Sequence, residues 1–218
     1  MQLSFSNSMV LVCIFEIFLT VVLLLFPNSI LKVFGVTDSA YSYALSYYKI
    51  VALGCLFQGI TQLCCDFVRV SGKPILGMCV TGIGAVTNII LDAVFIIVFK
   101  WGVVGAGLAT VTGQIISAIF GLTLIFTHKS QVRISKDIFK LNKKMCSQII
   151  SCGFAFFVAQ MAMAFISLVY NSQLGKYGGD IAISVYAVIS SIMTFVIMPA
   201  SGISQGIQPI VGNNYGSS

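Results

Sequence analysis

Two acidic side chains stand inside long apolar stretches of the sequence, where a charge is costly and usually serves a function. They are Glu16 and Asp92, whereas the other acidic residues lie in polar connections or at the end of an apolar stretch. Of these, Asp66 is expected to form an ion pair with Arg69, one helical turn later. Asn88 precedes Asp92 by four residues, and this spacing puts both side chains on one face of a helix. Carboxylate and amide oxygens that share a face suit a small hard cation, or a proton on the aspartate.

Thr110 is expected to join this group from the next helix. A short turn around Trp101 folds the chain back, with Asp92 nine residues before Trp101 and Thr110 nine residues after it. At ~1.5 Å per residue both lie about 13 Å from the turn, and by the same count Gln114 roughly faces Asn88. The prediction is a cation site at Asp92, Asn88 and Thr110. The alternative is a polar contact that only holds two helices together.

Other candidate residues have no such constellation around them. Glu16 either lines a cavity or forms a structural pair. The last apolar stretch carries prolines, which kink a helix, and glycines four residues apart, which let helices approach closely. It is either a bent helix lining a transport path or an ordinary packed helix. Candidate cavity residues are Gln114, Glu16, Gln205 and Gln208, and candidate kink or packing residues are Pro199, Gly202, Gly206, Pro209 and Gly212.

Composition places these residues in membrane helices. Of the 218 residues, 58% are hydrophobic and 8% are charged, with a mean hydropathy of +1.01. Soluble domains carry about 25% charged residues, so a soluble protein is excluded. Apolar stretches of about 20 residues can cross a bilayer core of ~30 Å. The expected fold is an all-α, polytopic transmembrane bundle of about six spans: Met9–Pro27, Ala44–Phe67, Ile75–Phe99, Gly102–Phe126, Cys146–Tyr170 and Ile181–Val211.

The basic residues predict how the spans cross the membrane. The net charge is +6, and half of the twelve basic residues fall in the 128–144 stretch, with Arg69 and Lys73 in an earlier connection. The positive-inside rule puts both connections, and hence both chain ends, in the cytoplasm. Binding of nucleic acid would need a basic patch on a soluble face, so the expected partner of these charges is membrane lipid.

Neither an enzyme nor a metal protein is expected. The seven cysteines are odd in number and lack CxxC spacing, which favours small buried apolar side chains over disulfides or metal ligands. Ser204 lies in a Gly-x-Ser-x-Gly pattern, but such a nucleophile needs a strand-turn-helix context and a histidine. The single histidine, His128, lies at the basic connection. No cofactor is predicted.

Three stretches of the sequence carry a resemblance: Phe67–Pro74, Asn88–Asp92 with Trp101–Thr110, and Met198–Gly216. Together they resemble the multidrug and toxic compound extrusion (MATE) transporters, in particular the bacterial branch with a cation site in the N-terminal lobe. The resemblance implies helices three to eight of twelve, with 1–127 ending the N-terminal lobe, 128–145 a cytoplasmic basic linker and 146–218 beginning the C-terminal lobe. The chain is therefore expected to lack helices at both ends, and to lie in the plasma membrane.

The resemblance also implies the role of the site. In that branch Asn88, Asp92 and Thr110 bind the coupling ion, sodium or a proton, together with a first-helix aspartate that would precede residue 1. Ala93 stands where the family has proline, which predicts a straighter helix. The implied function is antiport of drug-like amphipathic compounds by alternating access. Two alternatives are a lipid-linked saccharide flippase of the same superfamily, disfavoured because no intramembrane arginine cluster is present, and a non-transporting remnant or assembly partner.

Overall fold

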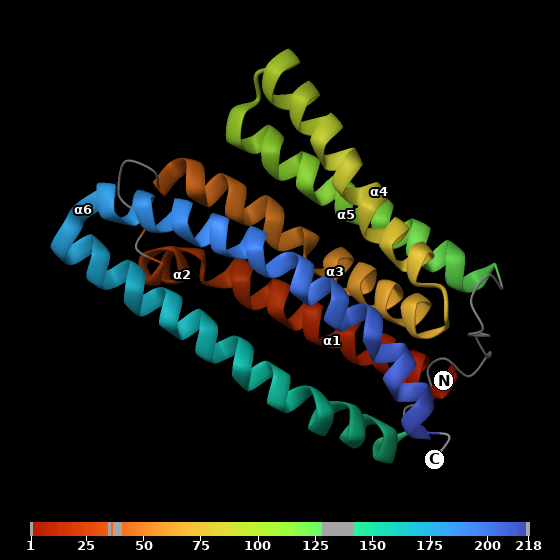
Figure 1. Cartoon of the computed structure of the whole chain (residues 1–218). Coiled ribbons are helices and arrows are strands. Elements are labelled where there is room, and N and C mark those ends of the chain that lie inside the picture. The colour runs from red at the N-terminus through yellow and green to blue at the C-terminus, as the bar shows by residue number, and fades with distance from the viewer. Residues whose placement is uncertain (1, 35, 37–40, 128–141, 217–218) are drawn as a thin grey trace. The chain divides into compact units, whose positions relative to one another are not determined.

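The computed structural model describes residues 2–34, 36, 41–127 and 142–216, which form helices joined by short connections (Figure 1). No strand occurs among these residues, and the all-α prediction is confirmed. Most of the predicted basic linker, 128–141, lies outside the described residues. The helices are α1 (Gln2–Leu25), α2 (Pro27–Val33), α3 (Tyr41–Val70), α4 (Pro74–Asp92), the π-helix η1 (Ala93–Val98), α5 (Gly102–Phe126) and α6 (Lys143–Gly216).

The predicted number of membrane spans is confirmed, because six helical segments of the described chain are long and apolar enough to cross a bilayer. The first span begins at Leu3 rather than Met9. The short helix α2, which the sequence analysis did not predict, follows it. The segments are Leu3–Leu25, Tyr41–Val70, Pro74–Val98, Gly102–Phe126, Lys143–Gly179 and Ile181–Gln208.

Prolines and glycines set several helix ends. Pro27 and Pro74 open α2 and α4, at positions where a missing backbone N–H removes no helical hydrogen bond. Gly72 has φ +81 in the turn between α3 and α4, a conformation that glycine adopts without steric cost. At the other end of α4, the rings of Phe95 and Trp101 stack with centroids 5.2 Å apart across the turn into α5.

Helix α3 is central to the first compact unit of the chain, Met1–Cys152, because it contacts α1, α4 and α5. Small residues allow these close contacts, as is usual between membrane helices. A Cβ on Gly107 of α5 would lie 3.2 Å from Ile50 Cγ2, and one on Gly121 would lie 2.7 Å from Cys64 Cβ. The buried core consists of Phe5, Cys64, Cys65, Val68, Val80, Leu124 and Ile125. All seven cysteines are free, but only Cys64 and Cys65 are buried and Cys152 is exposed, so the predicted burial holds for two of them.

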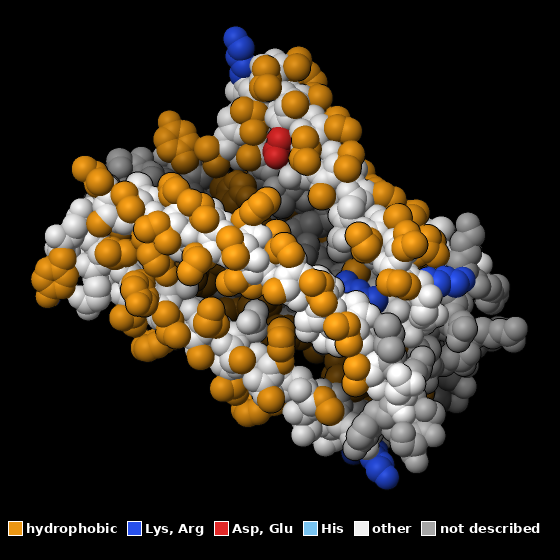
Figure 2. All heavy atoms as spheres, in the orientation of Figure 1, with side chains coloured by type: hydrophobic (Ala, Val, Ile, Leu, Met, Phe, Trp, Pro, Cys, Tyr) orange, Lys and Arg blue, Asp and Glu red, His pale blue; other side chains and the backbone are white. Residues whose placement is uncertain are grey.

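Apolar side chains cover most of the outer surface of the helices. Figure 2 shows hydrophobic side chains spread over the visible face, with few lysine, arginine or acidic side chains among them. Residues such as Ile75, Ile89 and Phe195 are more than half exposed. Lipid tails are as apolar as these side chains, so this surface is suited to a bilayer.

The second compact unit, Gly153–Ser218, is a hairpin formed by the two arms of α6. The reversal is at Gly179, with φ 62 and ψ −162, a region essentially restricted to glycine. Tyr170 and Tyr186 stack across the hairpin with centroids 5.5 Å apart. The backbone is helical at both Pro199 and Pro209, so the predicted proline kinks do not appear as breaks in the helix.

Candidate functional site

The site is built where α4 and α5 approach most closely. A Cβ on Gly113 of α5 would lie 2.7 Å from the carbonyl oxygen of Gly84, and one on Gly84 of α4 would lie 2.8 Å from that of Gly113 and would also overlap Ser117 Oγ. Two helices with side chains at these positions would have to stand further apart. The glycine pair therefore brings the polar residues on the facing sides of α4 and α5 within hydrogen-bonding distance.

Asn88 and Thr110 face one another across this contact. Asn88 Nδ2 donates to Thr110 Oγ1 at 3.4 Å, and Thr110 Oγ1 donates to the carbonyl of Ala106 at 2.9 Å. Both side chains are half-buried. Because the threonine hydrogen goes to the backbone and the asparagine amide goes to the threonine, the Asn88 carbonyl oxygen remains available as an acceptor.

Thr110 hydrogen-bonds Asn88, one helical turn before Asp92. An added Cβ on Gly113, next to Gln114, would lie 3.3 Å from Asn88 Cβ, so the register of α4 against α5 is shifted by less than one helical turn from the count made around Trp101. The π-helix η1 contributes to this shift, because Phe99 N–H donates to the carbonyl of Val94, five residues back. A π-helix bonds i to i+5 and is wider than an α-helix, so the residues between Asp92 and the turn span less length than the regular rise predicts.

Asp92 is the last residue of α4, immediately before the π-helix. Its Oδ1 atom is buried and accepts no hydrogen bond in the described structure. Buried polar atoms normally have partners, and a carboxylate oxygen without one is suited to bind a cation or to carry a proton. Short π-helical segments often occur at functional sites. Ala93 begins this segment, so the hydrogen bonding of the helix changes from α to π at this residue; the straighter helix predicted from Ala93 stays a prediction.

A cavity of about 230 Å³, lined by polar and small residues, adjoins the pair, and Asp92 does not line it. Three of the hydroxyl groups that line it donate hydrogen bonds to backbone carbonyls. Thr61 donates to Gln114 at 3.3 Å, Thr81 to Met78 at 3.1 Å and Ser117 to Val80 at 2.8 Å. Their remaining lone pairs are acceptors. The lining residues are Gln58, Thr61, Thr81, Gly84, Ala85, Asn88, Thr110, Gly113, Gln114 and Ser117.

Gln114 enters this cavity from α5, but it packs toward α3 rather than pairing with Asn88. Its Oε1 atom is buried without a hydrogen-bond partner, and a Cβ on Gly54 of α3 would overlap that atom. Sequence analysis missed the contribution of α3. Gln58 and Thr61 lie three residues apart, and this spacing on one helix face was the available signal.

The remaining candidates lie elsewhere. Glu16 lies on α1, where its side chain packs over Gly59 of α3. In the second unit, Gln205 and Gln208 are exposed. A Cβ on Gly202, Gly206 or Gly212 would meet no atom within 4 Å, so the described chain does not itself cover these glycines.

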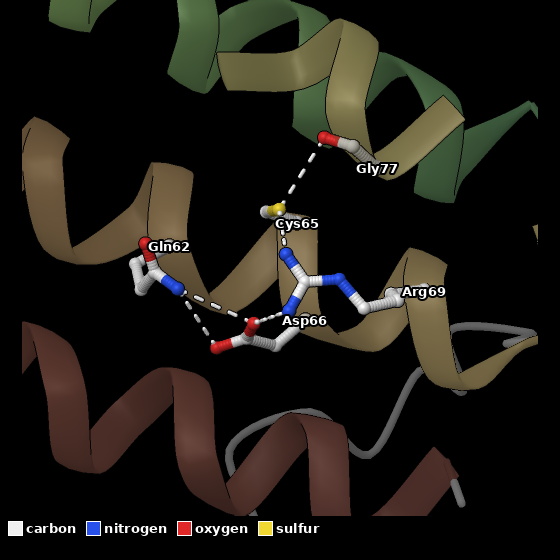
Figure 3. A network of polar contacts seen from close by, with 5 residues as sticks. All are labelled: Gln62, Cys65, Asp66, Arg69 and Gly77. Atoms are coloured by element: carbon white, nitrogen blue, oxygen red, sulfur yellow. Dashed lines mark hydrogen bonds and ion pairs between the residues drawn. The ribbon is translucent and has the colours of Figure 1, made fainter. Parts of the chain in front are cut away.

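The predicted ion pair of Asp66 and Arg69 is confirmed, with 3.2 Å between Arg69 Nη1 and Asp66 Oδ1. Figure 3 shows that it belongs to a larger network. Gln62 Nε2 donates to both carboxylate oxygens, and Arg69 Nη2 donates to Cys65 Sγ at 3.2 Å. Cys65 Sγ in turn donates to the carbonyl of Gly77 on α4 at 3.3 Å. The network ties the end of α3 to the start of α4.

The sequence of this chain is similar to those of known membrane transport proteins. The family model MatE matches residues 1–94 and 155–218. Multidrug export protein MepA of Staphylococcus aureus (strain bovine RF122 / ET3-1) is 27% identical over 190 residues, covering 87% of this chain and 42% of MepA. MepA of Staphylococcus saprophyticus (strain ATCC 15305) is 26% identical over 188 residues, covering 86% and 42%. The chain thus spans less than half the length of these curated relatives.

Solved structures show the same fold. One, described as the outward-facing conformation of a multidrug resistance MATE family transporter of the MOP superfamily, matches with a TM-score of 0.87 and 22% identity over 99% of this chain and 48% of the other. The inward-facing conformation matches with a TM-score of 0.81 and 23% identity over 96% and 48%. With a family model matched along well over half of its length and this helical arrangement, the chain belongs to the MATE family of membrane transporters.

Proposed function

We propose that this chain forms part of a cation-coupled antiporter, in which sodium or a proton bound at Asp92 drives export of drug-like amphipathic compounds by alternating access. The observation that carries the proposal is the buried Asp92 Oδ1 atom, which has no hydrogen-bond partner in the described structure. An ionisable residue inside a membrane span is costly and usually marks an ion pathway. The MepA relatives are multidrug export proteins by name.

The proposed cation ligands are oxygens of Asp92, Asn88 and Thr110. Asn88 and Thr110 already lie 3.4 Å apart through Nδ2 and Oγ1, and Asp92 follows Asn88 by one helical turn on the same face. Carboxylate, amide and hydroxyl oxygens are hard ligands, which suit sodium as well as a proton. Further ligands would come from water or from helices of the transporter outside this chain.

The charge on the cation supplies the driving force. One charge moving through ~100 mV releases about 2.3 kcal/mol. Since 1.4 kcal/mol corresponds to a tenfold ratio, one charge per cycle sustains roughly a 40-fold substrate gradient. The proposal requires no cofactor besides the coupling ion.

The proposed setting is the plasma membrane, with both chain ends in the cytoplasm. Arg69 and Lys73 at the α3–α4 connection, and the basic 128–144 stretch, support this orientation through the positive-inside rule. In the proposed organisation, 1–127 closes the first lobe, 128–145 connects the lobes and 146–218 opens the second. The proposed partners are membrane lipid and helices equivalent to those of the relatives that this chain does not cover.

The substitution Asp92→Asn tests the proposal, because it removes the charge while keeping the shape of the side chain. The protein is expressed as its own gene encodes it, and efflux of a fluorescent cationic dye is followed in everted membrane vesicles. We expect the variant to reach the membrane in normal amounts and to lose efflux driven by a sodium or proton gradient. Cation-driven efflux that is unchanged in the variant would contradict the proposal.

A further inference from the structure

Glu16 is a second ionisable side chain inside a membrane span, and the site at Asp92 does not use it. It lies in the Leu3–Leu25 segment, nine residues before the end of α1 at Leu25. At ~1.5 Å per residue this is about 13 Å from that end, and the distance to the other end is longer. A glutamate side chain is too short to reach either headgroup region from there, so its carboxyl group remains at the level of the hydrocarbon.

The carboxyl group is held at the interface between α1 and α3. A Cβ on Gly59 of α3 would lie 2.8 Å from Glu16 Cγ and 2.9 Å from Glu16 Oε1. The absence of a side chain at Gly59 therefore provides the space that Glu16 fills. Gly59 faces α1, whereas Gln58 and Thr61 line the cavity shared with α4 and α5, so this carboxyl group lies apart from the cation site.

Three hydrogen-bond donors along this interface bind backbone carbonyls rather than Glu16. Thr20, one turn further along α1, donates to the carbonyl of Ala52 at 3.3 Å. Tyr48 donates to the carbonyl of Leu23 at 3.1 Å, and the thiol of Cys55 lies 3.9 Å from the carbonyl of Val51. In the described structure Glu16 accepts no hydrogen bond from a side chain. The side chains along this interface therefore provide no hydrogen bond that would stabilise a charged Glu16 carboxylate.

No cation of the described residues pairs with Glu16. On α3, Lys49 is ten residues before Gly59 and Arg69 is ten residues after it, each about 15 Å away along the helix. Arg69 is bound to Asp66, seven residues after Gly59. Lys32 on α2 lies beyond the end of α1. The other titratable groups facing this region are the thiols of Cys13 and Cys55 and the Tyr48 hydroxyl, which are neutral when protonated.

We propose that Glu16 is a second proton-binding site, at the α1–α3 interface. An isolated carboxylate at the centre of a membrane span is disfavoured, and a bound proton removes the charge. A proton fits this place better than a metal cation, because hard cations take about six oxygen ligands and the interface provides little besides the carboxyl group. Glu16 gives up its proton when water reaches the interface.

Infrared spectroscopy tests the proposal directly. The protein, as its own gene encodes it, is placed in lipid vesicles in heavy water at neutral pH, and the carbonyl stretch of protonated carboxyl groups is recorded. We expect the wild type to show a band that Glu16→Gln lacks and that Asp92→Asn and Asp66→Asn retain. The band should fade as the pH is raised, and added sodium should leave it unchanged. Identical spectra for the wild type and Glu16→Gln would overturn the proposal.

A second pair of variants keeps the carboxyl group and moves it. Gly59→Ala should displace Glu16 and shift the frequency or the pH midpoint of the band, whereas Gly82→Ala, where an added Cβ meets nothing within 4 Å, should leave both unchanged. A band that is the same in Gly59→Ala would place the protonated group elsewhere. The spectra do not depend on transport, so failure here would leave the function proposed for Asp92 intact, and the reverse also holds.

Discussion

Replacing Gly113 with alanine should push α4 and α5 apart at the candidate site. The added Cβ would lie 2.7 Å from the carbonyl oxygen of Gly84 and 3.3 Å from Asn88 Cβ, whereas ordinary contact begins at 3.4 Å. The obstacle is backbone, which cannot turn away as a side chain does. The helices must therefore separate by about 0.7 Å, the difference between the ordinary and the observed distance.

This separation should also break the contact between Asn88 and Thr110. The distance from Asn88 Nδ2 to Thr110 Oγ1 is already 3.4 Å, and a further 0.7 Å would take it beyond hydrogen-bonding range. Overpacking costs about 1–3 kcal/mol, and a hydrogen bond between membrane helices contributes about 0.6 kcal/mol on average. We therefore expect the free energy of unfolding to fall by about 2–4 kcal/mol.

The assay compares Gly113→Ala with Gly82→Ala. Both variants gain the same helix propensity, up to ~1 kcal/mol, but an alanine at position 82 on α4 meets no atom within 4 Å. Equilibrium unfolding in detergent micelles and cation-driven efflux are measured for both. Only Gly113→Ala should lose stability and efflux. If the two variants were equally stable and equally active, α4 and α5 would not approach as closely as described, and the reasoning would fail.

Two further predictions concern a side chain at the site and a turn distant from it. Thr110→Val should raise the cation concentration that half-saturates efflux by roughly 3- to 20-fold, because it removes an interhelical contact of about 0.6–1.7 kcal/mol. Thr112→Val is the matched control, since Thr112 also donates to the carbonyl four residues back but lies on the exposed side. An equal effect in both variants would count against a role for Thr110. Gly179→Ala should destabilise the α6 hairpin by about 1–3 kcal/mol, because φ 62 with ψ −162 is strained for alanine. The control is Gly153→Ala, where an added Cβ meets nothing within 4 Å. Equal thermal unfolding temperatures for the two variants would mean that the turn relaxes without strain.

The sequence was informative where a property depends on one helix. The spans follow from hydropathy alone, and the Asp66–Arg69 pair and the shared face of Asn88 and Asp92 follow from helical spacing. Their surroundings depend on contacts between helices. The register of Thr110 could not be counted accurately, because the six π-helical residues shorten the path to the turn and the turn itself has positive φ at Lys100 and Gly102. Gln114 turned out to pack over Gly54 of α3, a contact that no local pattern predicts.

Other misses have similar causes. Helix α2 is only seven residues long and contains Lys32, so neither its length nor its hydropathy distinguishes it from a connection. The bend expected at the prolines of α6 stays a prediction, because the backbone is helical at Pro199 and Pro209 and a helix can bend without breaking. In a membrane helix, neighbouring groups can compensate for the donor that proline lacks.

Cation binding by the purified protein tests the central claim most directly. Binding of radioactive sodium, and release of protons when sodium is added, are measured in lipid vesicles for the wild type and for Asp92→Asn. If the buried Asp92 oxygen holds the coupling ion, the wild type binds sodium, or a proton that sodium displaces, and Asp92→Asn loses this binding while remaining folded and keeping the proton on Glu16. Equal binding by the two proteins would contradict the account.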